Sequence, residues 1–321
     1  MRKSGIWIGA VLLFVLLAGC SNNAAVENEP SSSPAVDNHT EETAAPEQQP
    51  AEQQPDKKHQ EEAKPERAAF KQLESVFGFA DESGEQLITI PSESGADPEH
   101  PEQFKAAIGN NGQWIEIEFV RLQEANEQDN GRQNMYNFNN MKGCVYKAKN
   151  GKFAPDKSYL LVKDAVIGKG ALIDLKSATD SQSPSGQYLP ADAETIAQVE
   201  AIKKRKVKAS SLLAESAEEK IALFVFERQG DDMLASIAYI KRNAVLFKDY
   251  PAKYDEFSTW RVDSGDEPGL FEVLFLARSD EGLLLGISWG APEGESLSIL
   301  KEADGALQET DLHSGRYWSP V

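Results

Sequence analysis

A pentapeptide near the carboxyl end of the chain has the form of a nucleophile motif. The segment 286–290 (Gly-Ile-Ser-Trp-Gly) fits G-x-S-x-G, and Asp304 or Asp311 and then His313 follow Ser288 in the order that one class of serine hydrolases uses. The surrounding sequence argues against this chemistry, because the next residues predict a turn rather than a helix and only 33 residues follow Ser288. A surface serine hydrolase is therefore the weakest of three functional hypotheses, and we assign no catalytic residue.

Metal chemistry has few candidate ligands after residue 69. The two histidines there, His100 and His313, are not part of an H-E-x-x-H motif. Residues 126–131 resemble the front of a calcium loop, but the charged first ligand is absent and Asn137 stands where a bidentate Glu is needed. An acidic stretch at 263–267 could hold a hard cation, although Asp and Gly are typical of solvated turns. We expect no metal and no cofactor.

Amide and aromatic side chains gather in one segment of the chain. Six Asn fall between Asn126 and Asn140, with Tyr136 and Phe138 among them. Amides beside aromatic faces are the groups that recognise sugars. An edge strand with a polar outer face has the same composition, and we favour that interpretation.

Other conspicuous side chains have structural explanations. The basic run Lys203–Lys208 could contact an anionic wall polymer or lipid headgroups, but charge complementarity at the carboxyl end of a helix explains it without a ligand. The pairs Trp260-Arg261 and Tyr317-Trp318 are interpreted as packing anchors. Cys144 is predicted to be a small buried apolar side chain rather than a nucleophile.

Hydrophobic periodicity predicts both helices and strands. Apolar residues at helical spacing, Pro near the start and Gly at the end predict short amphipathic helices at 65–78 and 97–109. A third helix is predicted at 191–206, with acidic residues in its first turn and basic residues in its last. Alternation predicts a half-buried strand at 114–120. Further strands are predicted at 221–226, 233–240, 245–247, 271–276, 283–289 and 297–300.

These elements predict an α+β fold with a mostly antiparallel sheet of meander hairpins and a few short amphipathic helices, because the gaps between strands are too short for parallel crossovers. We expect an α+β subdomain at 70–180 and a β-rich subdomain with one helix at 181–321, or a single domain over 70–321. A faint similarity between 117–147 and 224–248 is compatible with a duplicated hairpin unit, and also with two unrelated meanders.

The first twenty residues carry a targeting signal. Met1-Arg2-Lys3 is followed by an almost wholly apolar run to Leu17 and then by small residues, which predicts a secretory signal peptide at 1–19. Leu17-Ala18-Gly19-Cys20 resembles the lipobox of bacterial lipoproteins. The resemblance implies cleavage before Cys20, lipidation of the Cys20 sulfur, typically with palmitate, and anchoring of the mature amino terminus in the cell membrane on its extracytoplasmic face.

Residues 20–69 are predicted to form a disordered acidic tether. From Ser21 to Ala69 the chain has six Pro, no Gly, no aromatic residue and a net charge of −7. Such a segment buries too little apolar surface to offset its conformational entropy. As a flexible coil it would span roughly 40 Å.

Composition narrows the choice of function. A net charge of −19 makes nucleic acid a poor partner, and two Cys are too few for a disulfide framework. We expect a non-enzymatic binding, sensing or interaction domain, with the membrane as one partner through the lipid and an envelope protein or wall polymer as another. The alternative is a solute-binding lipoprotein of a transporter, which predicts two lobes of alternating strands and helices.

Overall fold

The structure is a computed structural model that describes residues 67–92, 95–179, 187–242, 244–256, 260 and 270–319. All of these residues belong to one compact unit spanning residues 60–321. Strands make up 53% of the structure, and its described part contains one α-helix. None of the described helices is long and apolar enough to cross a membrane.

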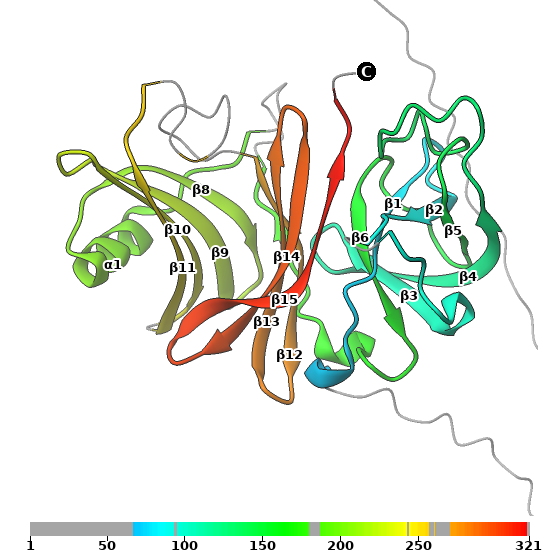
Figure 1. Ribbon diagram of the computed structural model, residues 1–321. Coiled ribbons are helices and arrows are strands. Elements are labelled where there is room, and N and C mark those ends of the chain that lie inside the picture. Colours follow the sequence, from blue (N-terminus) through cyan, green and yellow to red (C-terminus); the bar gives the residue numbers. More distant parts are fainter. Residues whose placement is uncertain are drawn as a thin grey trace, which may run out of the picture. The chain divides into compact units, whose positions relative to one another are not determined.

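The amino-terminal half of the unit is a closed six-stranded antiparallel barrel, in the order β1-β2-β5-β4-β3-β6 (Figure 1). Its strands are β1 (Phe77–Ala80), β2 (Gln86–Thr89), β3 (Phe104–Gly109), β4 (Gln113–Gln123), β5 (Gly143–Ala148) and β6 (Ser158–Lys163). Three short 3-10 helices accompany them, η1 (Phe70–Gln72), η2 (Pro101–Gln103) and η3 (Lys169–Ala171). All six strands contribute to one buried cluster, which fills the barrel as alternation along each strand requires. Its largest members are Phe104, Tyr146, Phe153 and Tyr159.

The carboxyl-terminal half consists of two four-stranded antiparallel meanders. The first meander is β8 (Val207–Glu215), β9 (Glu219–Phe226), β10 (Asp232–Lys241) and β11 (Ala244–Lys253), extended at its β8 edge by the short strand β7 (Lys176–Ser177). The second meander is β12 (Phe271–Ser279), β13 (Gly282–Ala291), β14 (Gly294–Ala303) and β15 (Ala306–Tyr317). Strands at the same position in the two meanders are β8 and β12, β9 and β13, β10 and β14, and β11 and β15. The members of these pairs begin 64, 63, 62 and 62 residues apart, so the two meanders have almost the same strand spacing along the chain.

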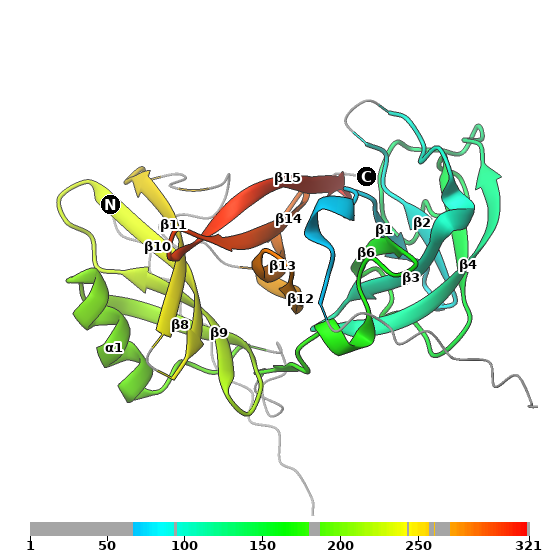
Figure 2. The same ribbon diagram turned by 90° about the horizontal axis from the view of Figure 1, so that it is seen from below.

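The two meanders lie next to each other (Figures 1 and 2), and residues of both form one apolar cluster. Ile221, Leu223 and Ile237 come from the first meander, and Leu285 and Ile287 come from the second. The first strands of the two meanders, β8 and β12, are in contact, and so are the last strands, β11 and β15. The outer strands of each meander therefore contact their counterparts in the other meander.

Helix α1 (Ala193–Lys203) packs on the other face of the first meander, where Val199 joins Phe224 and Phe226 in a buried cluster. The predicted helix at 191–206 is confirmed. Asp192 is its N-cap and accepts a hydrogen bond from the backbone N–H of Thr195 at 2.8 Å, as N-cap carboxylates do.

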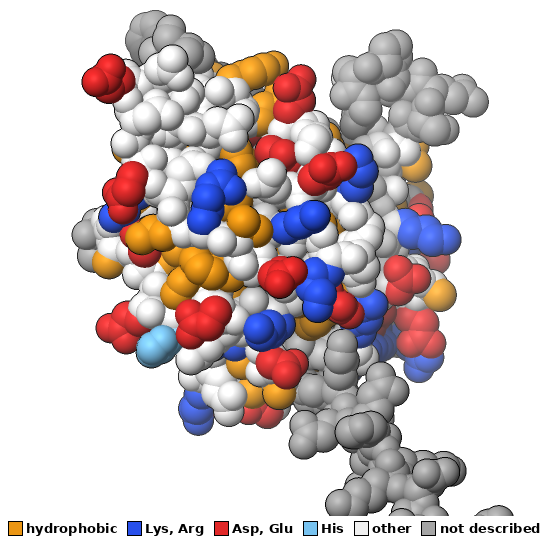
Figure 3. Space-filling view, turned by 90° about the vertical axis from the view of Figure 1, so that its right-hand side faces the viewer, with side chains coloured by type: hydrophobic (Ala, Val, Ile, Leu, Met, Phe, Trp, Pro, Cys, Tyr) orange, Lys and Arg blue, Asp and Glu red, His pale blue; other side chains and the backbone are white. Residues whose placement is uncertain are grey.

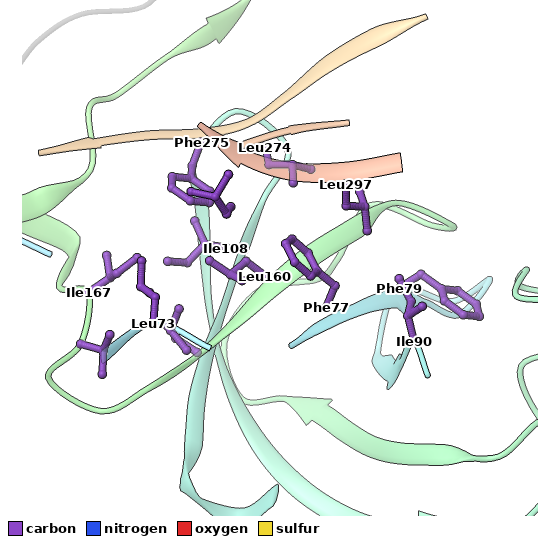
Figure 4. Packing of buried hydrophobic residues seen from close by; sticks show 14 of the residues in the cluster. Leu73, Phe77, Phe79, Ile90, Ile108, Leu160, Ile167, Leu274, Phe275 and Leu297 are labelled. Atoms are coloured by element: carbon purple, nitrogen blue, oxygen red, sulfur yellow. The ribbon is translucent and has the colours of Figure 1, made fainter. Parts of the chain in front are cut away.

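The barrel packs on the other face of the second meander. Phe79 and Leu160 of the barrel share a buried cluster with Leu274, Phe275 and Leu297 of the second meander (Figure 4). The open edge of β12 is also covered, because backbone N–H groups of residues 68, 111, 112 and 173 donate to its carbonyls. Covering an edge in this way removes a site of unwanted strand pairing.

The prediction of an α+β fold with several amphipathic helices is wrong. The structure is a mostly antiparallel β fold with a barrel, and the described residues of the helices predicted at 65–78 and 97–109 form a 3-10 turn followed by β1 or β3. Both strands are buried on two faces, so their apolar residues form continuous runs that do not alternate. The predicted strands at 114–120 and in the carboxyl-terminal half are confirmed within β4 and β9–β14.

Two predicted features lie at the limits of the described residues. The boundary predicted near residue 180 falls in 180–186, outside the described residues. The described chain begins within the segment predicted as a tether. There Ala68 is fully buried and pairs with Ser279 at the end of β12.

Candidate functional site

The predicted lipidation site, Cys20, lies outside the described residues, and so do the acidic stretch 263–267 and Arg261. Among the described residues, no group of three or more His, Cys, Asp or Glu side chains could hold a metal ion.

Ser288 is not a nucleophile at a strand-to-helix turn. It lies within β13, is 3% exposed, and its Oγ donates a hydrogen bond to Oε2 of Glu295. Ser288 pairs with Leu297, whereas His313 pairs with the next residue, Ser298. Paired residues of antiparallel strands face the same side and neighbours along a strand face opposite sides. Ser288 and His313 therefore lie on opposite faces of the second meander.

The hydroxyl of Ser288 belongs to a buried polar network that sequence analysis missed. Glu295, with 8% of its side chain exposed, accepts hydrogen bonds from the Ser288 and Ser158 hydroxyls and from Nε of Arg316 at 2.6 Å. Arg316 has 3% of its side chain exposed and also donates to Oδ1 of Asp156 at 2.8 Å. The network joins the barrel to β13, β14 and β15. Its charged members have no distinct signal in the sequence, because β14 and β15 contain many other polar and charged residues.

The asparagine-rich loop, defined here as residues 124–142 between β4 and β5, is held by its own amides. Asn137 is 1% exposed and donates to Oδ1 of Asp129 at 2.7 Å and to the carbonyl of Arg132 at 2.8 Å. Asn126 donates to Asn140 at 3.1 Å. Further backbone N–H groups of the loop donate to the side chains of Asn126, Asp129, Asn130 and Asn134. The loop is thus not the predicted edge strand, and most of its amides are used to fold it.

The loop docks on the end of β15. Backbone N–H of Gln133 donates to the carbonyl of Tyr317 at 2.8 Å, and backbone N–H of Tyr317 donates to Oε1 of Gln133 at 2.6 Å. Asn134 Nδ2 donates to the carbonyl of Trp318 at 3.1 Å. Oδ1 of Asp156 accepts from backbone N–H of Met135 at 3.1 Å, so the polar network also holds the loop. Two segments that sequence analysis treated separately are therefore neighbours.

Two tyrosines remain exposed at this place. Tyr136 is 76% exposed, the largest value among the exposed large apolar side chains, and Tyr317 is 41% exposed. The Tyr317 hydroxyl donates to Glu293, which raises the pKa of that hydroxyl, and the Arg132 guanidinium lies 5.0 Å from its ring centre. The prediction that Tyr317 is a packing anchor is therefore only partly met. We call Tyr136, Tyr317 and the asparagine-rich loop the tyrosine surface.

The predicted basic run is used within the fold. Lys203 pairs with Asp249 at 2.5 Å, and Lys206 pairs with Glu200 at 2.6 Å. Nε of Arg205 donates to the carbonyl of Glu227 at 2.7 Å. These contacts join the end of α1 to the first meander, as the structural interpretation of this run requires.

Two other predicted side chains are part of the packing. Nε1 of Trp260 donates to the carbonyl of Tyr250 at 2.9 Å. Cys144 is fully buried in the barrel, and burial raises the pKa of its thiol to about 11. The prediction that Cys144 is a small buried side chain is confirmed.

Comparisons of the chain with models of protein families, with characterised proteins and with solved structures found no match. Functional inference therefore depends on the residues and contacts described above.

Proposed function

We propose that this protein is a lipid-anchored extracytoplasmic protein whose folded part binds a component of the cell envelope without catalysing a reaction. The observation that carries the proposal is the amino-terminal sequence, in which an apolar signal segment ends in Leu17-Ala18-Gly19-Cys20 and an acidic, proline-containing stretch follows. Such an arrangement would hold the folded unit away from the membrane. Its partner would be an envelope protein or a wall polymer.

The described residues support binding rather than catalysis. The Ser288 hydroxyl donates to the Glu295 carboxylate, which also accepts from Arg316. His313 lies on the opposite face of the second meander from Ser288. The antiparallel sheets also differ from the two lobes of alternating strands and helices that a transporter-associated solute-binding protein predicts. The tyrosine surface, by contrast, presents exposed rings on an ordered loop, as binding sites do.

Metabolic labelling with palmitate tests the anchor. The wild-type chain is expected to incorporate label and to fractionate with the membrane, whereas Cys20→Ala is expected to do neither. Cys144→Ala is the matched control, because it removes the other cysteine of the chain, which is buried in the barrel. Equal labelling of the wild-type and Cys20→Ala chains would refute lipidation at this residue.

A fluorophosphonate probe tests the absence of serine hydrolase chemistry. The wild-type chain is expected to be labelled no more than Ser288→Ala, because the Ser288 hydroxyl is buried and the carboxylate that accepts from it, Glu295, is already paired with Arg316. Labelling that disappears only in Ser288→Ala would reverse this conclusion.

A further inference from the structure

The tyrosine surface combines a preorganised loop with an exposed ring. The asparagine-rich loop has 19 residues and no strand or α-helix of its own, and loops of this length in compact domains are commonly functional. Its conformation is fixed before any ligand arrives, since Asn137 and Asn134 are buried and hydrogen-bonded. A rigid loop loses little conformational entropy on binding, so an exposed Tyr136 is a good anchor for a ligand.

The chain segments next to Tyr136 contain no charged residue. The nine residues 133–141 contain no Asp, Glu, Lys or Arg, and neither does the segment 317–319 beside them. Within the loop, Asp129 accepts from Asn137 and Arg132 lies over the Tyr317 ring. At its border, Asp156 pairs with Arg316 and Glu293 accepts from the Tyr317 hydroxyl. Across the barrel side of the molecule, by contrast, Lys, Arg, Asp and Glu are interspersed (Figure 3). An anionic polymer would find no cluster of positive charge at Tyr136.

The apolar area is small for a protein partner. Tyr136 and Tyr317 are the only large apolar side chains of the tyrosine surface that are strongly exposed among the described residues. A stable protein interface covers about 800 Å² on each partner around a well-packed apolar centre. One ring with neighbouring amide and hydroxyl groups suits a pyranose, whose C–H groups pack on the aromatic face while its polar substituents form hydrogen bonds.

The tyrosine surface and Ala68 lie at opposite ends of the second meander. The described chain begins beside the turn between β12 and β13, where Ala68 hydrogen-bonds to Arg278 and Asp280. Trp318 hydrogen-bonds to Glu293 in the turn at the opposite end of β13. The ten residues of β13 span roughly 33 Å. Figure 1 shows η1 at one end of the second meander and the carboxyl-terminal end of β15 at the other.

From these observations we propose that Tyr136 binds an uncharged, N-acetylated glycan strand of the cell wall. A sugar ring packs on the Tyr136 ring, and exposed amides such as that of Asn139 bond to its acetamido groups. The buried network of Glu295, Arg316 and Asp156 positions the loop without touching the glycan. The wall as the source of the glycan rests on the proposed lipid anchor.

Co-sedimentation with wall glycan tests the proposal. The probe is purified peptidoglycan stripped of its anionic polymers, incubated with the full mature chain in detergent, with a soluble hexamer of N-acetylglucosamine as competitor. The wild-type chain is expected to sediment and to be released by the hexamer. Tyr136→Ala should weaken binding by about tenfold or more, and Tyr136→Phe should retain it because the ring remains. Tyr254→Ala is the matched control, since Tyr254 is 39% exposed beyond β11.

Three results would overturn the proposal. They are absence of wild-type binding, equal binding by Tyr136→Ala, and binding only to peptidoglycan that still carries its anionic polymers. A photocrosslinker at position 136 that captures protein and no glycan would also overturn it, while leaving the proposed envelope-binding function in place. Palmitate labelling measures lipidation independently of glycan binding, so the absence of the lipid anchor and the absence of the glycan site give different results.

Discussion

The two meanders have nearly the same strand spacing but different coverings. Both contribute one face to the shared apolar cluster. On its other face the first meander is covered by α1, a helix of 11 residues, whereas the second meander is covered by the whole six-stranded barrel. Two meanders with nearly the same strand spacing can therefore be covered by elements of different size, provided that each element supplies an apolar surface that packs on the sheet.

The two meanders differ in the residues on the face that points away from the shared cluster, because a helix covers this face of the first meander and the barrel covers it in the second. The first meander places Phe224 and Phe226 beneath the helix. The second places the Phe275 ring against the barrel, where a β-bulge follows Val273 and a Cβ on Gly286 would come within 2.6 Å of that ring. Only the second meander carries the buried Glu295 and Arg316, which lie where the barrel and the tyrosine surface meet it.

The largest expected effects come from removing one phenylalanine beneath each covering. Phe224→Ala and Phe275→Ala should each lower the free energy of unfolding by about 3–5 kcal/mol, because both rings are fully buried. Urea denaturation measures the loss. Hydrogen exchange should then separate the variants, with faster exchange in α1 for Phe224→Ala and in β1 and β6 for Phe275→Ala. Faster exchange in the same segments for both would show that the two coverings are not independent.

The same comparison shows what the sequence could and could not predict. Strands β9–β14 of the two meanders and α1 were predicted, because apolar runs bounded by turns or helix-end charges mark them, whereas β8 and β15 were not predicted. In the barrel, β4 was predicted from its alternation, but β1, β2 and β3 were not, because β1 and β2 have four residues each and β1 and β3 are buried on two faces. For the tyrosine surface, the amide-rich segment was recognised in the sequence. Its contact with Tyr317 was not predicted, because the hydrogen bond joins residues 184 positions apart. Only tertiary structure brings such residues together.

Breaking the buried network should have the next largest effect. Glu295→Gln removes the charge that faces Arg316 and is expected to cost about 3 kcal/mol, since the Arg316 guanidinium stays buried. The loss is measured by urea denaturation. Glu293→Gln is the control, because Glu293 is exposed in the adjacent turn. A cost as small as that of the control would mean that the remaining contact with Asp156 is sufficient for Arg316.

A second buried carboxylate links the two meanders and gives a pH-dependent prediction. Burial disfavours ionisation of Glu219, but hydrogen bonds from Lys241 at 2.8 Å and Ser216 at 2.8 Å, with Arg278 at 3.4 Å, hold its pKa below its ordinary value. A lowered pKa in the folded state means that the contribution of Glu219 to stability is present above the unfolded value near pH 4.3 and is lost as the pH falls.

Glu219→Gln should therefore cost about 1.5–3 kcal/mol at pH 7, and progressively less as the pH is lowered below about 4. Thermal unfolding of the variant and the wild type across pH 3–7 measures this difference. Glu218→Gln should cost less than about 1 kcal/mol, since its side chain is 52% exposed. A difference between Glu219→Gln and wild type that does not vary with pH would argue that the charge of Glu219 contributes nothing.

The smallest effect is expected at the start of α1, the smaller of the two coverings. Asp192→Ala removes the N-cap and should cost about 1 kcal/mol, whereas Glu194→Ala in the first turn makes no such cap and should cost less. The pKa of Asp192 is lowered by its hydrogen bonds from Lys220 and from backbone N–H of Thr195, so its contribution is also lost at low pH. Because α1 covers only the first meander, hydrogen exchange should accelerate in the helix and stay unchanged in the barrel. Faster hydrogen exchange in both the helix and the barrel would show that weaker packing of α1 on the first meander also loosens the packing of the barrel on the second meander, through the apolar cluster that the meanders share.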